Sequence, residues 1–262
     1  PEGSKTSKGR AIQNLINLPP EDKVMAYLNV KDLKDKEYLD SHFVIMCTKN
    51  GIVKKTTLEA YSRPRQNGIN AIGIREGDSL LEAKLTDGNC DIMIAANSGK
   101  AIRFPESKVR AMGRGASGVR GISIDTSKNF VVGMICVNNF DSNVLVVSEN
   151  GYGKRSDIDS YRITNRGGKG VKTINITTKT GNLIAIKNVI DSDGLMIINK
   201  SGVMIRMNVE AMRVMGRATQ GVKLINLKES DQISSVAKVE IDESDETDSV
   251  VLDNEFTDDK EN

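Results

Sequence analysis

The sequence predicts an all-β fold, a propeller-like disc of four-stranded antiparallel blades. Two observations lead to this prediction. A strand, a glycine turn and a second strand that ends in cations occur in series four times along the 262 residues, about 50 residues apart. A second glycine, followed by apolar residues at alternate positions, occurs once in each of these repeats. A unit of this size cannot bury its apolar face alone, so we expect the units to stack around a common axis.

Each repeat begins with a predicted hairpin. In the first repeat, Phe43 to Lys55 contains an apolar strand, a turn at Gly51 and a second strand. The dipeptides at the four turns are typical of hairpins, and they are Asn50-Gly51, Ser98-Gly99, Asn150-Gly151 and Ser201-Gly202. A cation stands four residues after each turn glycine, at Lys55, Arg103, Arg155 and Arg206.

The second glycine of each repeat precedes a further predicted strand. These glycines are Gly68, Gly118, Gly170 and Gly221. Apolar residues four and six positions later, such as Ile122 and Ile124, predict a strand with one buried face. Another apolar strand closes each repeat, at residues 80–85, 130–137, 183–189 and 233–239. Few segments have a helical pattern, so an α/β fold is not expected.

Cations also stand at fixed offsets before the second glycine. Arginines lie four and eight residues before it, at Arg110, Arg114, Arg162, Arg166, Arg213 and Arg217. The first repeat has a shorter loop and offers Arg63 and Arg65 instead. The densest example is residues 161–176, where Lys169 and Lys172 join two of these arginines beside several glycines. Glycines allow another molecule to approach the backbone closely, and cations beside them suit a phosphate chain.

The two ends of the chain differ from the repeats. Ser4 to Arg10 resembles a second glycine turn, and Val24 to Val30 is predicted to be the closing strand of that incomplete unit. We therefore expect the chain to begin within a blade, as a fragment of a longer protein. The predicted domain covers residues 1–240, with complete repeats near 43–86, 91–137, 143–190 and 195–239.

Residues 241–262 form an acidic tail. They hold ten acids and one base, a net charge of −9, whereas the rest of the chain carries +11. A basic body indicates a polyanionic partner, and so charged a tail with few aromatic residues is predicted to be disordered. Two interpretations of the tail remain open: a solubilising end, or a DNA mimic that lies on the cationic surface and tunes binding.

Several other functions are disfavoured by the sequence. It has no apolar run of about 18 residues and no signal peptide pattern, so no membrane association is expected. Cys47, Cys90 and Cys136 are scattered, which indicates unpaired thiols in a reducing cytoplasm and no structural zinc site. Residues 167–170 lack the spacing of a nucleotide-binding loop. His42, the single histidine, is expected at a strand edge on the surface rather than in a catalytic triad.

Three motifs carry a resemblance to a known family. They are Lys8-Gly9-Arg10-Ala11-Ile12-Gln13-Asn14-Leu15-Ile16, then Val109-Arg110-Ala111-Met112-Gly113 with Ser117-Gly118-Val119-Arg120-Gly121-Ile122, and Asn150-Gly151-Tyr152-Gly153-Lys154-Arg155. With these motifs in this order and spacing, the chain up to the acidic tail resembles the C-terminal DNA-wrapping domain of DNA gyrase A. The resemblance implies a β-pinwheel disc, usually of six blades, with duplex DNA wrapped around a basic rim.

The resemblance also implies a role within a larger enzyme. Gyrase A works with gyrase B as an ATP-driven type II topoisomerase that introduces negative supercoils, in the bacterial cytoplasm and at the nucleoid. The family's signature box, Gln-Arg-Arg-Gly-Gly-Lys-Gly, has no identical copy here, and Asn165 to Gly170 is its nearest relative in a later repeat. The breakage-reunion domain with its catalytic tyrosine is absent from these residues. The fragment is therefore expected to be non-catalytic by itself, with no cofactor, and its expected partners are duplex DNA, gyrase B and the N-terminal part of gyrase A.

The candidate DNA-binding residues are the cations that recur at fixed offsets, because a ring would place each offset along one rim. They are Lys54, Lys55, Arg63, Arg65, Arg103, Arg110, Arg114, Arg120, Lys154, Arg155, Arg162, Arg166, Lys169, Lys172, Arg206, Arg213, Arg217 and Lys223. No base-reading helix is evident, so weak sequence preference and strong salt dependence are expected. Two alternatives remain: the corresponding domain of topoisomerase IV, and a propeller that binds proteins, which would show aromatic anchors and a rim of mixed charge.

Overall fold

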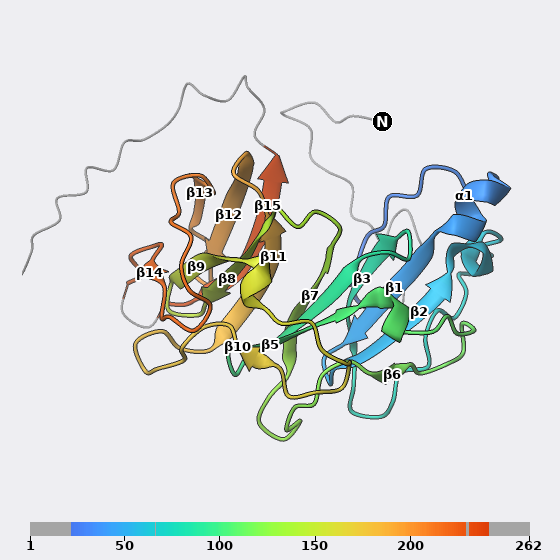
Figure 1. The fold of residues 1–262 in the computed structure, drawn as a ribbon, viewed down its shortest axis with the longest axis horizontal. Helices are drawn as coiled ribbons and strands as arrows, with labels where there is room; N and C mark the ends of the chain where they lie inside the picture. Colours follow the sequence, from blue (N-terminus) through green and yellow to red (C-terminus); the bar gives the residue numbers. More distant parts are fainter. Residues whose placement is uncertain (1–21, 66, 229–230, 241–262) are drawn as a thin grey trace, which may run out of the picture.

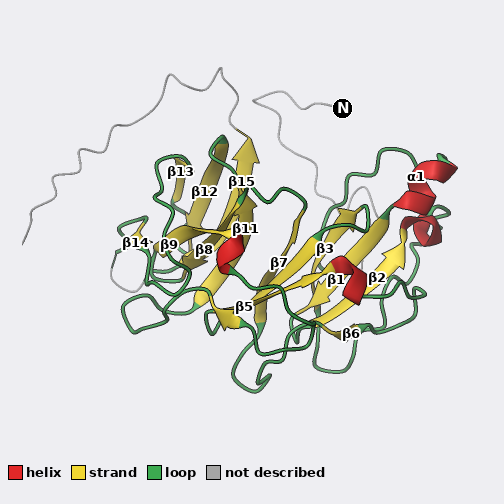
Figure 2. Cartoon of the chain, in the orientation of Figure 1, coloured by secondary structure: helices red, strands yellow, loops and turns green. Residues whose placement is uncertain are grey.

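The computed structural model describes residues 22–65, 67–228 and 231–240, and it contains four antiparallel sheets, one for each repeat (Figures 1 and 2). We number the sheets in chain order, and in Figure 1 the first lies at the right and the fourth at the left. The first three sheets have four strands, with the orders β3-β1-β2-β6, β10-β5-β4-β7 and β11-β8-β9-β14, and the fourth sheet has the order β13-β12-β15. The predicted all-β architecture of repeated blades is confirmed.

The four predicted hairpins form the middle of the sheets. Their strands are β1 (Phe43–Thr48) with β2 (Ile52–Thr57), β4 (Asp91–Ala96) with β5 (Lys100–Pro105), β8 (Asn143–Ser148) with β9 (Tyr152–Asp157), and β12 (Asp193–Asn199) with β13 (Met204–Asn208). The glycine at each turn has a positive φ, between 75° and 86°, a conformation that favours glycine over residues with a Cβ. A single-turn 3₁₀ helix follows the second strand in three repeats, as η2 (Leu58–Tyr61), η3 (Glu106–Lys108) and η4 (Ile158–Ser160).

The predicted closing strands are confirmed, and they lie at one edge of each sheet. They are β3 (Leu80–Thr86), β7 (Val131–Val137), β11 (Leu183–Val189) and β15 (Ile233–Glu240). These strands also contact one another in series, β3 with β7, β7 with β11 and β11 with β15. We call this edge of each sheet the inner edge and the opposite edge the outer edge.

The outer edge of each of the first three sheets is supplied by the following repeat. A two-residue strand just after the second glycine pairs with the hairpin of the preceding sheet: β6 (Val119–Arg120) with β2, β10 (Val171–Lys172) with β5, and β14 (Val222–Lys223) with β9. The prediction that one repeat makes one blade is therefore wrong, because each of the first three sheets receives its outer strand from the following repeat. We call these outer strands the exchanged strands.

The predicted strand four to six residues after the second glycine is also wrong. Ile122 and Ile174 are each 1% exposed, but they lie outside any strand; the side chains beneath the turn glycines of the preceding sheets are those of Ile122 under Gly51 and Ile176 under Gly99. A Cβ on Gly51 would lie 2.8 Å from the Ile122 side chain. The alternating apolar pattern therefore arises because these side chains are buried against the neighbouring hairpin. It does not mean that the segment pairs as a strand through backbone hydrogen bonds.

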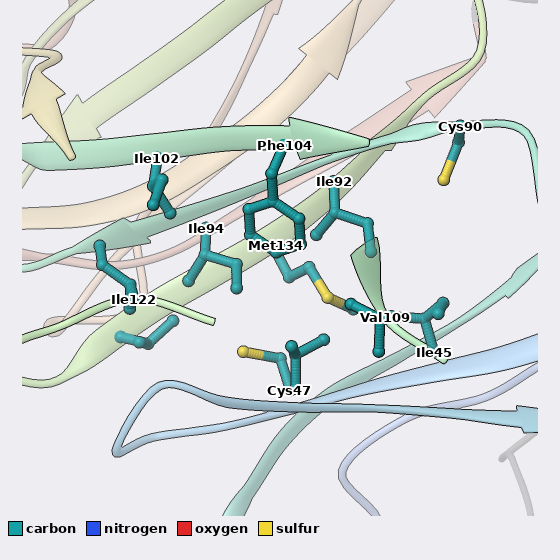
Figure 3. Packing of buried hydrophobic residues seen from close by; sticks show 12 residues of the cluster. Ile45, Cys47, Cys90, Ile92, Ile94, Ile102, Phe104, Val109, Ile122 and Met134 are labelled. Atoms are coloured by element: carbon teal, nitrogen blue, oxygen red, sulfur yellow. The ribbon is translucent and has the colours of Figure 1, made fainter. Parts of the chain in front are cut away.

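The core consists of one apolar layer between each pair of neighbouring sheets. Figure 3 shows the layer between the first and second sheets, where Ile45 and Cys47 face Ile92, Ile94 and residues around them. The intervening residues Met93 and Ala95 face the third sheet instead. Both faces of the central strands are thus buried, which explains their nearly continuous apolar sequence. A third layer joins the third and fourth sheets.

The free face of the first sheet is covered by the chain that precedes it. Helix α1 (Lys36–Ser41) and apolar residues between 26 and 33 pack on this face, around Leu39, Val44 and Met46. Residues 24–30 form no strand, so the closing strand predicted there is wrong. The predicted turn at Ser4 to Arg10 and the acidic tail lie outside the described residues. Within the described ranges, no helix has the length and apolar character needed to cross a bilayer.

Candidate nucleic-acid interface

The recurring arginines lie on three loops that cross from one sheet to the preceding one. We call residues 110–118, 162–170 and 213–221 the outer loops, and each leads directly into the exchanged strand β6, β10 or β14. Gly118, Gly170 and Gly221 end these loops with positive φ values. A Cβ on any of the three would lie 2.5–2.6 Å from a backbone oxygen of the preceding hairpin. Only glycine allows the loop to lie this close to the sheet below.

Arginine side chains of the second and third outer loops contact the exchanged strand that follows the preceding loop. Arg166 donates a hydrogen bond to the backbone oxygen of Arg120 at 3.2 Å and another to that of Lys108 at 3.1 Å. Arg217 donates to the backbone oxygen of Lys172 at 2.8 Å. The same offset in consecutive repeats therefore makes the same contact. As a result, the three loops form one connected strip along the outer edges of the first three sheets.

Thirteen of the eighteen candidate cations are solvent-accessible. Arg114 and Arg217 are partly buried, and the others are exposed: Arg63, Arg65, Arg110, Arg120, Arg162, Arg166, Lys169, Lys172, Arg206, Arg213 and Lys223. The residues of this set on the three loops and their exchanged strands share the connected strip. Arg63 and Arg65 lie on the shorter loop of the first repeat, and Arg206 lies on β13 of the fourth sheet.

Three of the cations four residues after a turn glycine are buried, which corrects the expectation that they face a rim. Lys55, Arg103 and Arg155 are 5–7% exposed. Lys55 forms an ion pair with Glu106 at 2.7 Å, and Arg103 forms one with Asp91 at 2.8 Å.

Each of these three cations contacts the following repeat in the segment just after its second hairpin strand. Glu106, the partner of Lys55, lies in η3. Arg103 donates to the backbone oxygen of Ile158 at 2.8 Å, and Arg155 donates to that of Met212 at 2.6 Å and pairs with Asp191. Their regular spacing thus reflects a repeated structural contact between blades. A solvated phosphate has no access to these three side chains.

Lys54 and Lys154 are also buried, each with 0% exposure, against the expectation that they contact DNA directly. The Lys54 ammonium donates to the backbone oxygens of Ala71, at 2.7 Å, and of Arg114. The Lys154 ammonium donates to the backbone oxygen of Gly216 and to the Thr219 hydroxyl at 3.0 Å. Among the described residues neither forms an ion pair with a carboxylate.

Burial without an anionic partner disfavours the charged form of both lysines. Burial, and secondly repulsion from Arg217, lowers the pKa of Lys154 to about 8. The same two causes, with Arg114 as the neighbouring cation, lower the pKa of Lys54. A lysine ammonium and an arginine guanidinium therefore lie near each other at both sites, Lys54 with Arg114 and Lys154 with Arg217.

Sequence reasoning missed the acids that neutralise the buried cations and one exposed lysine of the strip. Glu106 is 0% exposed and also accepts hydrogen bonds from Thr86, at 2.8 Å, and Cys90, at 3.0 Å. Its burial could not be inferred, because it belongs to an exposed type of residue beside a proline. Lys108 is exposed next to the first outer loop, but its position does not recur in the other repeats.

The histidine and the cysteines lie outside the outer loops. In the part of the chain that the structure describes, no cluster of His, Cys, Asp and Glu has the form of a metal site. His42 is partly buried just before β1, with its Nδ1 2.9 Å from the Tyr38 backbone oxygen. Cys47 and Cys90 are buried free thiols. Burial raises the pKa of Cys47, and a hydrogen bond with Cys136, together with burial, raises that of Cys90.

Comparison with known proteins assigns the repeats to one family. A family model described as DNA gyrase C-terminal domain, beta-propeller, matches residues 42–87, 91–138, 142–189 and 195–240. The DNA gyrase A of Staphylococcus aureus (strain NCTC 8325 / PS 47) is 42% identical over 247 residues, which are 94% of this chain and 27% of that protein. The DNA gyrase A of Chlamydia muridarum (strain MoPn / Nigg) is also 42% identical, over 96% of this chain and 30% of that protein.

Solved structures agree on the fold. The C-terminal domain of a DNA topoisomerase IV has a TM-score of 0.81 at 23% identity, with 88% of this chain and 71% of that one covered. The C-terminal domain of a DNA gyrase A has a TM-score of 0.77 at 24% identity, with 88% and 75% covered. The chain spans less than a third of the length of the two curated relatives above. Since the family model matches all four repeats, the chain belongs to the DNA gyrase C-terminal domain family of β-propellers.

Proposed function

We propose that this chain is the DNA-wrapping part of a gyrase A protein, and that it binds and bends duplex DNA along the strip of outer loops without catalysing a reaction itself. In the intact protein it would work with gyrase B and the N-terminal part of gyrase A in an ATP-dependent type II topoisomerase. Its place there would be to direct the duplex so that strand passage has a preferred sense, which introduces negative supercoils.

One observation carries this proposal: equivalent cations on successive repeats lie on loops that touch one another. Arg166 and Arg217 each contact the backbone of the preceding outer strand, and Arg120, Lys172 and Lys223 occupy equivalent exposed positions on those strands. A surface that repeats one cationic element per blade suits a ligand that repeats one phosphate charge along its length. A protein ligand has no such periodic charge.

The free energy needed to bend DNA favours several weak contacts along the strip over one strong site. Bending a 20–30 bp duplex by 40–90° costs on the order of 1–6 kcal/mol. Contacts with phosphates along the strip would offset this cost and release counterions, so affinity should fall steeply with salt. The strip presents loops and two-residue strands rather than a helix suited to the major groove. Sequence preference should therefore arise from DNA deformability.

The decisive experiment is relaxation of a closed plasmid by a type I topoisomerase in the presence of the chain, followed by separation of the topoisomers. A linking number that shifts in proportion to bound protein is expected, because wrapped DNA is shielded from relaxation. Binding without any shift would overturn wrapping and leave simple association.

A triple variant tests whether the strip is the surface used. Replacing Arg120, Lys172 and Lys223 by alanine should reduce the slope of log affinity against log salt by about 2.7, if each cation contacts one phosphate. The matched control replaces Lys31, Lys34 and Lys36, which are exposed on the segment that covers the first sheet, away from the outer strands (Figure 1). Equal loss of affinity in both triple variants would mean that net charge, and not the strip, governs binding.

A further inference from the structure

The three junctions between an outer loop and the sheet beneath it differ in one buried residue. The position three residues after the turn glycine lies under the loop and is Lys54, Ile102 or Lys154, with 0%, 2% and 0% exposure. Lys54 and Lys154 donate to backbone oxygens of the loop above. At the middle junction a Cβ on Gly168 would lie 3.4 Å from the Ile102 side chain, so that loop rests on an apolar group.

A second difference lies in the loops themselves. The residue immediately before the second glycine is Ser117 above Lys54, Lys169 above Ile102 and Gln220 above Lys154. Lys169 is exposed, and it stands on the one described outer loop that has no lysine beneath it. Each junction therefore holds a single lysine at one of two positions, under the loop or on it, in addition to the arginine four residues before the glycine.

We propose that these are interchangeable placements of one positive charge, and that Lys54 and Lys154 take part in DNA binding from beneath their loops although no phosphate touches them. This inference rests on the proposed function. Both lysines point their ammonium groups at loop backbone rather than at an acid, so their charge is not neutralised within the protein. Buried charges are also screened less by salt than exposed ones, which lets the field reach a phosphate above the loop.

The arrangement also explains why the two placements exclude each other. Burial, and secondly repulsion from Arg114 or Arg217, already lowers the pKa of the lysine at these two junctions. A further lysine on the same loop would add a third like charge at short range. With isoleucine beneath, the middle loop has room for Lys169 without this repulsion.

Moving the charge at the third junction tests the proposal. Lys154→Ile reproduces the residue of the middle junction and should weaken duplex binding about two- to tenfold at roughly 0.1 M salt, the range expected for one nearby charge. Lys154→Ile combined with Gln220→Lys reproduces both residues of the middle junction and should restore affinity to within about twofold of the parent chain. A residue that only supports the fold would not be rescued by a lysine on the surface.

The fold has reason to tolerate Lys154→Ile, because the Thr219 hydroxyl already donates to the Gly216 oxygen at 2.8 Å. The pair Lys54→Ile and Lys54→Ile with Ser117→Lys gives an independent test at the first junction, and near-UV circular dichroism checks packing in every variant. Unchanged affinity in a folded Lys→Ile variant, or loss that the surface lysine fails to restore, would overturn the inference while the parent chain still binds. A parent chain that does not bind DNA would instead overturn the proposed function, and this inference with it.

Discussion

The hairpins of the first and fourth sheets have the same sequence form but different surroundings. Five of the six residues of β2 are buried, whereas β13 alternates between exposed and half-buried residues, with Met204 53% exposed. A Cβ on Gly51 would meet Ile122 at 2.8 Å, but a Cβ on Gly202 would meet nothing within 4 Å. The difference is the segment from the next repeat, which covers β2 and has no counterpart on β13 among the described residues.

This comparison shows that a repeat does not complete its own blade. It provides three strands, and the following repeat provides the outer strand, the apolar residue beneath the turn glycine and the loop that carries the cations. The same exchanged segment therefore contributes both to stability and to the cationic surface that we propose binds DNA. The predictions below compare substitutions at residues that contact the segment from the next repeat with substitutions at residues that do not.

The largest expected effect is the loss of an apolar residue under a turn glycine. Ile122→Ala should lower the free energy of unfolding by about 2–5 kcal/mol, because Ile122 is 1% exposed and its removal leaves a cavity between two sheets. Ile74→Ala removes an apolar residue six positions after the second glycine of the first repeat, two positions beyond the counterpart of Ile122; it is 47% exposed, and its loss should cost about 0.5 kcal/mol or less. Urea unfolding measures both, and equal losses would contradict the proposed dependence on strand exchange.

A smaller loss of stability is expected from substituting the glycine that allows the exchanged strand to approach the preceding hairpin closely. Gly170→Ala should lower the free energy of unfolding by about 2–4 kcal/mol, since the new Cβ would combine a positive φ with an approach of 2.5 Å to the Ala101 oxygen. Gly202→Ala has a positive φ but open space, so about 1–2 kcal/mol is expected from the backbone alone. Thermal unfolding ranks the two variants, and a reversed order would mean that the close approach relaxes without cost.

Electrostatic effects should be smaller and visible mainly in binding. Arg166→Ala should reduce the salt slope of DNA affinity by about 0.9, because Arg166 is held on the strip by two backbone contacts. Arg63→Ala serves as the matched control, since its loop ends at Gly68, beside which the structure shows no neighbour within 4 Å of a new Cβ. A loss for Arg63→Ala as large as that for Arg166→Ala would show that an ordered loop is not required.

The last expected effect is a change in the pH dependence of stability. The pKa of Lys154 is about 8 in the fold, against an ordinary value of 10.5. Between these values the unfolded chain binds more protons than the folded one, so this group makes the free energy of unfolding rise as the pH increases. Lys154→Ile should remove that rise, and Ile102→Val should keep it. The melting temperatures of the variants and the parent at pH 7 and 10 give the comparison, and an identical pH response in Lys154→Ile would exclude a depressed pKa.

Much of the fold follows from local sequence signals. Asn-Gly and Ser-Gly turns define the four hairpins, because their glycines favour the positive φ that a tight turn needs, and the apolar runs that close each repeat became the inner strands. The 50-residue period predicted stacked blades, since each unit leaves an apolar face that a neighbour must cover. The exposed cations of the outer loops were likewise found from their offsets.

The sequence by itself determined the repeat, the hairpins and the excess of cations at fixed positions. Only the tertiary structure decided which sheet each exchanged strand joins and which cations are buried. The physical reason is that burial depends on neighbours far along the chain: Lys55 meets Glu106 and Lys154 meets the loop at Gly216, both about 50 residues or more away. A regular spacing places residues on equivalent sites of every blade, but it does not distinguish a site between blades from a site that faces solvent.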